Sequence, residues 1–320
     1  KDLENKYDKV TAFIRPKDAF PGKSAVLNDA LPMTKGEAIL VFDADARVEK
    51  DFLSKLVPNL EPKDVGAVQA RKVIRNKDVN LLTKCQNNEM TMDTHCQVGR
   101  DSVRGAVELR GNGELIKREA LEDIKGWNNY TITDDLDMST RLHINGWDVR
   151  FCLDAVVYEE GIMYLMPLFR QRRRWLEGTI RRYLEYFWDV LFAKEMSLHV
   201  GFDLIAYITE FLLPACLIME VMIQTFRFVK GHENCILSSV VMILCVGLFF
   251  LLGLIYSFRK YSKYETLKAI FQAFVTSAYF ITIWFPIVMF IVFKIIFTKR
   301  TMDWGKTQHG VADNECAEVV

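Results

Sequence analysis

Two long stretches without a charged residue in the second half of the chain limit its possible folds most strongly. Residues 236–258 give 23 consecutive uncharged residues, and residues 269–293 give 25. About 20 apolar residues are enough for a helix to cross a bilayer. We therefore expect both stretches to be transmembrane helices. Residues 202–226 form a third candidate, although they include Asp203, Glu210 and Glu220, which are costly in lipid unless they lie near an interface or face protein.

The charges around these stretches constrain the topology. Three spans would place the C-terminal tail opposite the first half of the chain. Yet the tail is basic (Lys294, Lys299, Arg300, Lys306), as is the loop with Arg259, Lys260, Lys263 and Lys268, and basic flanks favour the cytoplasmic side. We therefore expect one segment to be interfacial or re-entrant, and Pro286 marks a place where the last helix could break. This predicts a multi-pass membrane protein with two or three spans.

The first half, up to about Val157, is mixed and polar and predicts an α/β domain. Residues 37–42, 65–70 and 147–153 have strand patterns, and residues 79–97 and 115–124 have helix patterns. Another helix is expected to open at Asp134 and run toward Gly146. Lysine plus arginine and aspartate plus glutamate both number 41, so no bulk field attracts nucleic acid. The seven cysteines form no C-x-x-C pair, which favours reduced thiols on a cytosolic face.

Between the two halves, residues 165–192 mix six arginines with Leu, Phe, Trp and Tyr. That composition predicts an amphipathic helix at a bilayer surface. We accordingly divide the chain into an α/β domain (1–160), an interfacial helix (161–196), a transmembrane region (197–298) and a cytoplasmic tail (299–320).

Two carboxylate motifs stand in the first half. Asp43 and Asp45 follow an apolar strand, where both can face a cleft and offer hard oxygen ligands to a divalent cation that bridges diphosphate oxygens. The alternative is a solvated turn. Asp134, Asp135 and Asp137 follow Thr133, and Thr133 can cap a helix whose dipole favours acids in its first turn. The functional interpretation makes Asp135 a general base that deprotonates an acceptor hydroxyl.

A basic motif, Gln171 to Trp175, precedes the apolar stretches. It is either a positive-inside flank or a set of donors for a leaving diphosphate, with Trp175 offering a flat face to a sugar or lipid. Lys23, after Gly22, could contact a nucleotide or could simply begin a helix. Residues 110–113, Arg-Gly-Asn-Gly, allow close approach of a ligand to the backbone or form an ordinary turn.

Read in order, these residues resemble the membrane-integrated family 2 glycosyltransferases, which include cellulose, chitin and hyaluronan synthases. Residues 22–28 match the family's lysine segment, Asp43 and Asp45 its D-x-D, residues 133–135 its T-E-D, and Gln171, Arg174 and Trp175 its Q-x-x-R-W. The resemblance implies a GT-A fold, a UDP-sugar donor, Mg²⁺ or Mn²⁺, and inverting transfer. The family begins this fold with a strand and a carboxylate pair for the uracil, so we expect a segment before Lys1.

The resemblance also implies a role for each site residue. Asp45 would hold the metal, Asp43 and Lys23 would contact the nucleotide, and Asp135 would be the base. Gln171 and Arg174 would hold the pyrophosphate, whereas Trp175 and Asp134 would lie on the acceptor side. Asp134 replaces the usual Glu of T-E-D, and residues 109–113 depart from the loop of cellulose synthases.

The C-terminal piece, with Trp284-Phe285-Pro286 and then residues 304–310, is similar to the end of cyanobacterial-type β-monoglucosyldiacylglycerol synthases. That branch implies transfer of glucose to 1,2-diacylglycerol in the bilayer, with the catalytic domain on the cytoplasmic face. Two alternatives stay open. One is a processive β-polysaccharide synthase, and the other is a non-catalytic membrane protein in which the carboxylates only cap helices.

Overall fold

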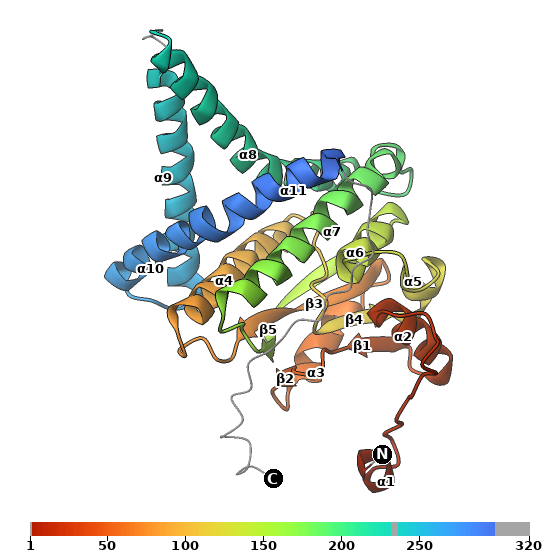
Figure 1. Ribbon diagram of the computed structural model, residues 1–320. Coiled ribbons are helices and arrows are strands. Elements are labelled where there is room, and N and C mark those ends of the chain that lie inside the picture. Colours follow the sequence, from red (N-terminus) through yellow and green to blue (C-terminus); the bar gives the residue numbers. More distant parts are fainter. Residues whose placement is uncertain (1, 232–235, 298–320) are drawn as a thin grey trace.

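The computed structural model describes residues 2–231 and 236–297. The tail predicted over 299–320, with residues 304–310, lies outside the described residues. The chain builds a sheet domain, a pair of long helices that cover it, and a group of apolar helices beyond them (Figure 1).

A five-stranded mixed sheet forms the centre of the domain. Its strands are β1 (Ala38–Val41), β2 (Arg47–Val48), β3 (Val65–Ile74), β4 (Glu114–Lys117) and β5 (Asp148–Glu159), in the order β1-β4-β3-β5-β2. Strands β3 and β5 pair in parallel and the other pairs are antiparallel. Strands β1, β3 and β5 therefore run in one direction, and their C-terminal ends meet at one edge of the sheet.

The three predicted strands are confirmed, but the helix expected over 115–124 is wrong in its first part. Residues Glu114–Lys117 form β4, and only Arg118–Asp123 form a helix, α5. Leu115 and Ile116 point to opposite faces of the sheet, where each packs into a different hydrophobic cluster. Because β4 fills the gap between β1 and β3, pairing on both sides overrides the helical preference of this short segment.

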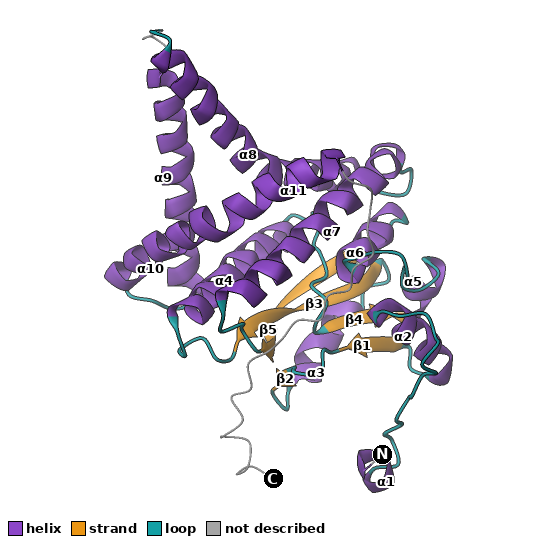
Figure 2. Ribbon diagram, viewed as in Figure 1, coloured by secondary structure: helices purple, strands orange, loops and turns teal. Residues whose placement is uncertain are grey.

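Helices cover both faces of the sheet (Figure 2). On one face, α3 (Phe52–Leu56) and the 3-10 turn η2 (Val57–Leu60) pack on Val65, Val68 and Val157. On the other, α5 and α6 (Asp134–Ile144) pack on Ala67, Ile116 and Val149. The N-terminal elements α1 (Asp2–Lys6), α2 (Lys23–Ala30) and η1 (Leu31–Met33) precede β1.

Two long helices separate the sheet from the apolar part of the chain. Helix α4 (Leu81–Ser102) begins with a capping box in which the Asn80 side chain accepts from Thr83 N and the Thr83 hydroxyl accepts from Asn80 N. Helix α7 (Leu165–Phe192) contains the predicted amphipathic segment. Figure 1 shows α4 and α7 side by side above the sheet.

The apolar helices are α8 (Leu198–Val229), α9 (Ile236–Tyr261), α10 (Thr266–Tyr279) and α11 (Phe285–Phe297), with a π-helical turn, η4 (Phe280–Trp284), between the last two. Among the described residues, Val240–Tyr261 and Thr266–Ile295 are long and apolar enough to cross a membrane. Figure 1 shows α8 and α9 projecting together from the body, whereas α10 and α11 lie along α7.

Asp203, the acid near the start of α8, faces protein as the sequence allowed. Its carboxylate accepts from Ala106 N at 2.8 Å and pairs with Arg100 at 3.3 Å. The N-terminal end of α8 is therefore attached to the sheet domain through Ala106 and to α4 through Arg100.

Candidate active site

A cavity of about 770 Å³ opens where the C-terminal ends of β1, β3 and β5 meet the long helices. All eight residues that the sequence nominated line it: Lys23, Asp43, Asp45, Asp134, Asp135, Gln171, Arg174 and Trp175. Four motifs separated by up to 152 positions, from Lys23 to Trp175, thus converge on one space.

Lys23, the first residue of α2, connects that helix to the sheet edge. Its ammonium donates to Asp43 Oδ1 at 2.7 Å and to the carbonyl of Gly111 at 2.6 Å. Burial alone would lower the pKa of Lys23, but the carboxylates of Asp134, Asp43 and Glu114 outweigh it and raise the pKa. Lys23 is therefore positively charged, and it lines the cavity among these acids.

The loop of residues 110–113 is shaped for close approach to the carboxylates. Gly111 has a φ of +78°, and a Cβ at this position would lie 3.1 Å from Asp135 Oδ2, so glycine is required here on two grounds. Buried Asn112 accepts from Asp43 N at 3.2 Å through its side chain. Buried Gln69 accepts from Arg110 N at 2.7 Å and donates to the Asn112 carbonyl at 2.9 Å. The loop is thus held by side chains of the sheet.

Asp134 and Asp135 open α6 as predicted, but Thr133 does not act as the expected side-chain cap. Thr133 occupies the N-cap position without a capping hydrogen bond, and its buried hydroxyl has no partner among the described residues. The reason is packing, because the Thr133 side chain faces Gly178 of α7. Asp135 satisfies the helix end instead, since its Oδ1 accepts from Leu136 N at 2.8 Å.

Burial and neighbouring charges raise the pKa values of two acids beside Asp135. Burial, followed by the charge of Asp135, raises the pKa of Asp134 to about 6. Burial and Asp135 likewise raise the pKa of Glu114 to about 8, and Glu114 accepts a short hydrogen bond from Gly111 N. The pKa of Glu114 therefore lies above neutral pH.

The far side of the sheet edge adds residues that the sequence did not single out. Asp45 accepts from Glu160 N at 3.2 Å, which ties the D-x-D segment to the end of β5. Lys72 of β3 pairs with Glu159 at 2.9 Å and lies 5.7 Å from the centroid of the Trp175 ring. Lys72, Glu159 and Glu160 all line the cavity.

Within the basic motif on α7, Arg172 and Arg174 have different surroundings. Arg174 lines the cavity. Arg172 is buried, where it pairs with Glu89 of α4 at 3.0 Å and lies 4.1 Å from the Trp175 centroid. Tyr279 of α10 donates to the same Glu89 oxygen at 2.9 Å. Arg172 is thus an internal brace that orients Trp175 and joins α4, α7 and α10.

A second buried network stands behind the site. Glu108 is fully buried and contacts Arg182 and Arg110 at 2.9 Å and Arg100 at 3.5 Å. Burial alone would raise the pKa of Glu108, but these three guanidinium groups outweigh it and lower the pKa to about 2. Arg110 also pairs with Asp93 at 2.7 Å, and both line the cavity. The network therefore fixes one wall of the site.

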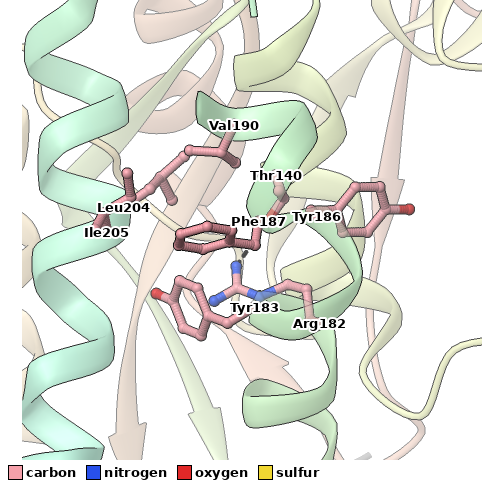
Figure 3. Close-up of a pocket in the computed structure, with 8 residues that line it drawn as sticks. All are labelled: Thr140, Arg182, Tyr183, Tyr186, Phe187, Val190, Leu204 and Ile205. Carbon is pink, nitrogen blue, oxygen red and sulfur yellow. Dashed lines mark hydrogen bonds between the residues drawn. The ribbon is translucent and has the colours of Figure 1, made fainter. Parts of the chain in front are cut away.

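Arg182 also joins α7 to α6, because it donates to Thr140 Oγ1 at 2.7 Å (Figure 3). Beside it lies a void of about 20 Å³ between α6, α7 and α8, little more than the space of one water. Its walls are the residues labelled in Figure 3: Thr140, Arg182, Tyr183, Tyr186, Phe187, Val190, Leu204 and Ile205. The N-terminal part of α8 is therefore packed closely onto α6 and α7.

The other end of the large cavity is apolar. Side chains from α8, α9 and the segment α10 to α11 form it: Leu213, Leu217, Ile243, Val246, Phe250, Phe280, Ile281, Trp284, Phe285 and Val288. One continuous space thus joins a charged sheet edge to an apolar surface formed by these helices.

Sequence reasoning missed Glu89, Asp93, Lys72 and Glu108. Glu89 and Asp93 lie four positions apart on α4, so they share one helix face. That spacing was the available signal in the sequence. Nothing in the local pattern indicated that their partners would be arginines in other elements.

Proteins of known function have sequences similar to this chain. The chain is 36% identical over 309 residues to a β-monoglucosyldiacylglycerol synthase of Trichormus variabilis, covering 96% of this chain and 66% of the relative. A β-monoglucosyldiacylglycerol synthase from Synechocystis is 32% identical over 318 residues, covering 99% of this chain and 66% of the relative. A poly-β-1,6-N-acetyl-D-glucosamine synthase of Staphylococcus epidermidis is 29% identical over 199 residues, covering 61% and 48%. The chain thus spans 66% of the length of the first two relatives.

Among solved structures, a mannosyltransferase from Pyrobaculum calidifontis in complex with GDP-Man and Mn²⁺ has a TM-score of 0.57 at 18% identity, covering 87% of this chain and 68% of that one. The likeness confirms the predicted GT-A type fold. The family model described as glycosyl transferase family group 2 matches residues 38–297. The chain therefore belongs to glycosyl transferase family group 2.

Proposed function

We propose that the chain transfers a hexose, glucose, from a UDP-sugar to the hydroxyl of a membrane lipid, 1,2-diacylglycerol, with inversion at the anomeric carbon. The observation that carries this proposal is the continuity of the cavity. Its charged end suits a sugar diphosphate, and its apolar end, formed by α8 to α11, suits acyl chains. The names of the relatives at 36% and 32% identity support the choice of sugar and lipid.

In the proposed mechanism, transfer is a single displacement. The hydroxyl oxygen of the acceptor attacks the anomeric carbon as its proton passes to Asp135, and the bond from that carbon to the diphosphate oxygen breaks, releasing UDP. Because Asp135 Oδ1 is fixed by Leu136 N, we assign the proton to Oδ2. Gln171 and Arg174 hold the diphosphate, Lys23 and Asp43 contact the nucleotide, and Asp134 and Trp175 lie beside the acceptor.

The donor set fits a divalent cation. No group of three acids, histidines or cysteines within residues 2–231 and 236–297 could hold a metal alone. However, Mg²⁺ is commonly bound by one or two carboxylates together with substrate phosphates, and Asp43 and Asp45 both line the cavity. We assign the metal to Asp45. When bound, it would neutralise charge on the leaving diphosphate.

The proposed orientation places the catalytic domain on the cytoplasmic side. Basic residues gather where α9 returns to the domain and in the following segment: Arg259, Lys260, Lys263 and Lys268. Such residues are retained on the cytoplasmic side of membranes.

One assay tests the function directly. Full-length protein in membranes that contain diacylglycerol receives labelled UDP-glucose or UDP-galactose, and the label is followed into the chloroform phase or into insoluble polymer. We expect glucose in the chloroform phase. Label confined to polymer would favour a polysaccharide synthase and overturn the lipid acceptor. If no metal-dependent UDP binding is detectable at all, the non-catalytic alternative holds.

A further inference from the structure

Trp284 belongs to the Trp-Phe-Pro piece of the sequence and has no role in the reaction proposed above. It is the last residue of the π-helical turn η4, and it lines the large cavity. Single π-helical turns are frequent at functional sites. The indole Nε1 of Trp284 is buried and has no hydrogen-bond partner among the described residues. Because a buried donor without a partner is destabilising, this N–H group indicates a partner that does not belong to the described chain.

Two of the described residues that line the cavity have a buried side-chain atom without a partner, Thr133 and Trp284. Packing explains the Thr133 hydroxyl, since this side chain faces Gly178. Ser277 also lines the cavity, but its hydroxyl donates to the Ala273 carbonyl at 2.8 Å. Within the described segment from α10 to α11, Trp284 is therefore the cavity-lining residue with a side-chain donor left for a bound molecule.

The Trp284 ring lies where the apolar and charged parts of the cavity meet. It stacks with Phe280 at a centroid distance of 6.4 Å and an interplanar angle of 21°. Phe280 in turn meets Phe250 of α9 edge to face at 5.6 Å, and both phenylalanines line the apolar end of the cavity. The Arg172 guanidinium of α7 lies 5.9 Å from the Trp284 centroid. Trp284 thus contacts the apolar end and the basic motif at once.

The same guanidinium relates Trp284 to Trp175, which the proposed mechanism places beside the acceptor. Arg172 lies 4.1 Å from the Trp175 centroid and 5.9 Å from the Trp284 centroid, so the two centroids are at most about 10 Å apart. Arg172 is itself held by its buried ion pair with Glu89 at 3.0 Å. A lipid in contact with Trp175 is therefore also within reach of Trp284.

The chemistry of a diacylglycerol fits this arrangement. Its free hydroxyl, which reacts beside Asp135 in the proposed mechanism, is only a few bonds away from two ester carbonyls, and the acyl chains continue from these esters. A carbonyl oxygen accepts hydrogen bonds, whereas an indole N–H only donates them. With the acyl chains in the apolar end of the cavity, the esters come to lie at the boundary where Trp284 stands.

We propose that the Trp284 N–H donates a hydrogen bond to an ester carbonyl of the acceptor lipid, and that this contact selects ester-linked over ether-linked glycerolipids. The assignment rests on the proposed function, because it takes the acceptor to be a diacylglycerol. Since Nε1 is buried, the indole turns toward the cavity when the lipid binds, and side-chain rotations of this kind are common on binding. An ether lipid has no carbonyl at this place and leaves the N–H without a partner.

Transfer to two matched acceptors tests the assignment. Full-length protein in a maltoside detergent, which contains no ester, receives UDP-glucose with either a diacylglycerol or the dialkylglycerol of equal chain length. The measured quantity is the ratio of the two kcat/KM values, which does not depend on the fraction of protein that is folded. Trp284→Phe keeps an aromatic ring and removes the N–H. Trp188→Phe is the control, because Trp188 is 64% exposed on α7 and is not among the described residues that line the cavity.

We expect the wild-type protein to prefer the diacylglycerol by roughly 3- to 10-fold, the effect of one hydrogen bond between uncharged groups. Trp284→Phe should lose this preference through a lower kcat/KM for the diacylglycerol alone, and Trp188→Phe should keep it. Equal use of both lipids by the wild type, or an unchanged preference in Trp284→Phe, would overturn the assignment and leave the proposed reaction intact. Transfer of glucose to neither lipid would refute the proposed function, and the assignment of Trp284 would fall with it.

Discussion

The contact between Gly178 of α7 and Thr133 offers a sensitive test of how the site is assembled. A Cβ on Gly178 would lie 2.4 Å from Thr133 Cγ2, whereas carbon atoms pack at about 3.5–4.0 Å. In Gly178→Ala, α7 and the segment before Asp134 must therefore separate by about 1 Å or more. Gln171 and Trp175 lie on one side of this contact and Asp135 on the other, so the two halves of the site move apart.

The expected effect is larger on catalysis than on stability. Overpacking of this kind costs about 1–3 kcal/mol, but a displacement of about 1 Å between reacting groups can lower the rate roughly 100-fold. We expect Gly178→Ala to reduce kcat of glucosyl transfer by 10- to 100-fold, while the fluorescence-detected Tm in detergent falls by a few degrees. Gly253→Ala is the control, because nothing lies within 4 Å of a Cβ at that position of α9.

A double variant identifies the cause. Thr133→Ala removes the clashing methyl group, and the hydroxyl it also removes has no partner among the described residues. Gly178→Ala with Thr133→Ala should therefore recover most of the lost rate, although the remaining Thr133 Cβ at 3.2 Å leaves some strain. Normal turnover in Gly178→Ala alone, or no recovery in the double variant, would refute the reasoning.

Three further changes have defined outcomes. Asp135→Asn should fold and bind UDP in calorimetry yet fail to transfer sugar, because it cannot take the acceptor proton; near-normal turnover would contradict its role as base. Glu114→Gln should gain Tm relative to wild type as the pH rises from about 5 to 8. The folded-state pKa of Glu114 is raised to about 8, so the wild-type protein loses roughly 1.4 kcal/mol of unfolding free energy per pH unit across that window. The variant does not lose this stability, because glutamine does not titrate. A difference in Tm that stays constant with pH would disprove this. Arg182→Met should cost about 3 kcal/mol or more in denaturant unfolding, because it breaks a buried ion pair; a change below 1 kcal/mol would show that Glu108 is satisfied by its other partners.

Much of the site could be predicted because its chemistry is local. The residue types in the D-x-D after an apolar strand and in the acidic helix start indicate the ligands that each could bind. The strand pattern placed Asp43 and Asp45 at the edge of the sheet, where they lie in the structure. The order of the four motifs along the chain indicated the glycosyltransferase family. The roles of these residues stay predictions until the variants are measured.

The parts that could not be predicted depend on distant partners. The arginines of α7 suggested a surface flank, yet Arg172 and Arg182 are 1% and 2% exposed because Glu89 and Glu108 meet them across 83 and 74 positions. A hydrophobic pattern shows which face of a helix is apolar. It does not show whether a charge on the other face meets solvent or a buried counter-charge.

The network around Glu108 has a consequence for the evolution of this chain. Arg100, Arg110 and Arg182 are balanced by Glu108, Asp93 and Asp203, three charges of each sign drawn from α4, the loop before β4, α7 and α8. A lone substitution leaves an uncompensated charge inside the protein, so drift at these positions should proceed by compensated pairs. We expect homologous chains to change these six positions together or to keep them all.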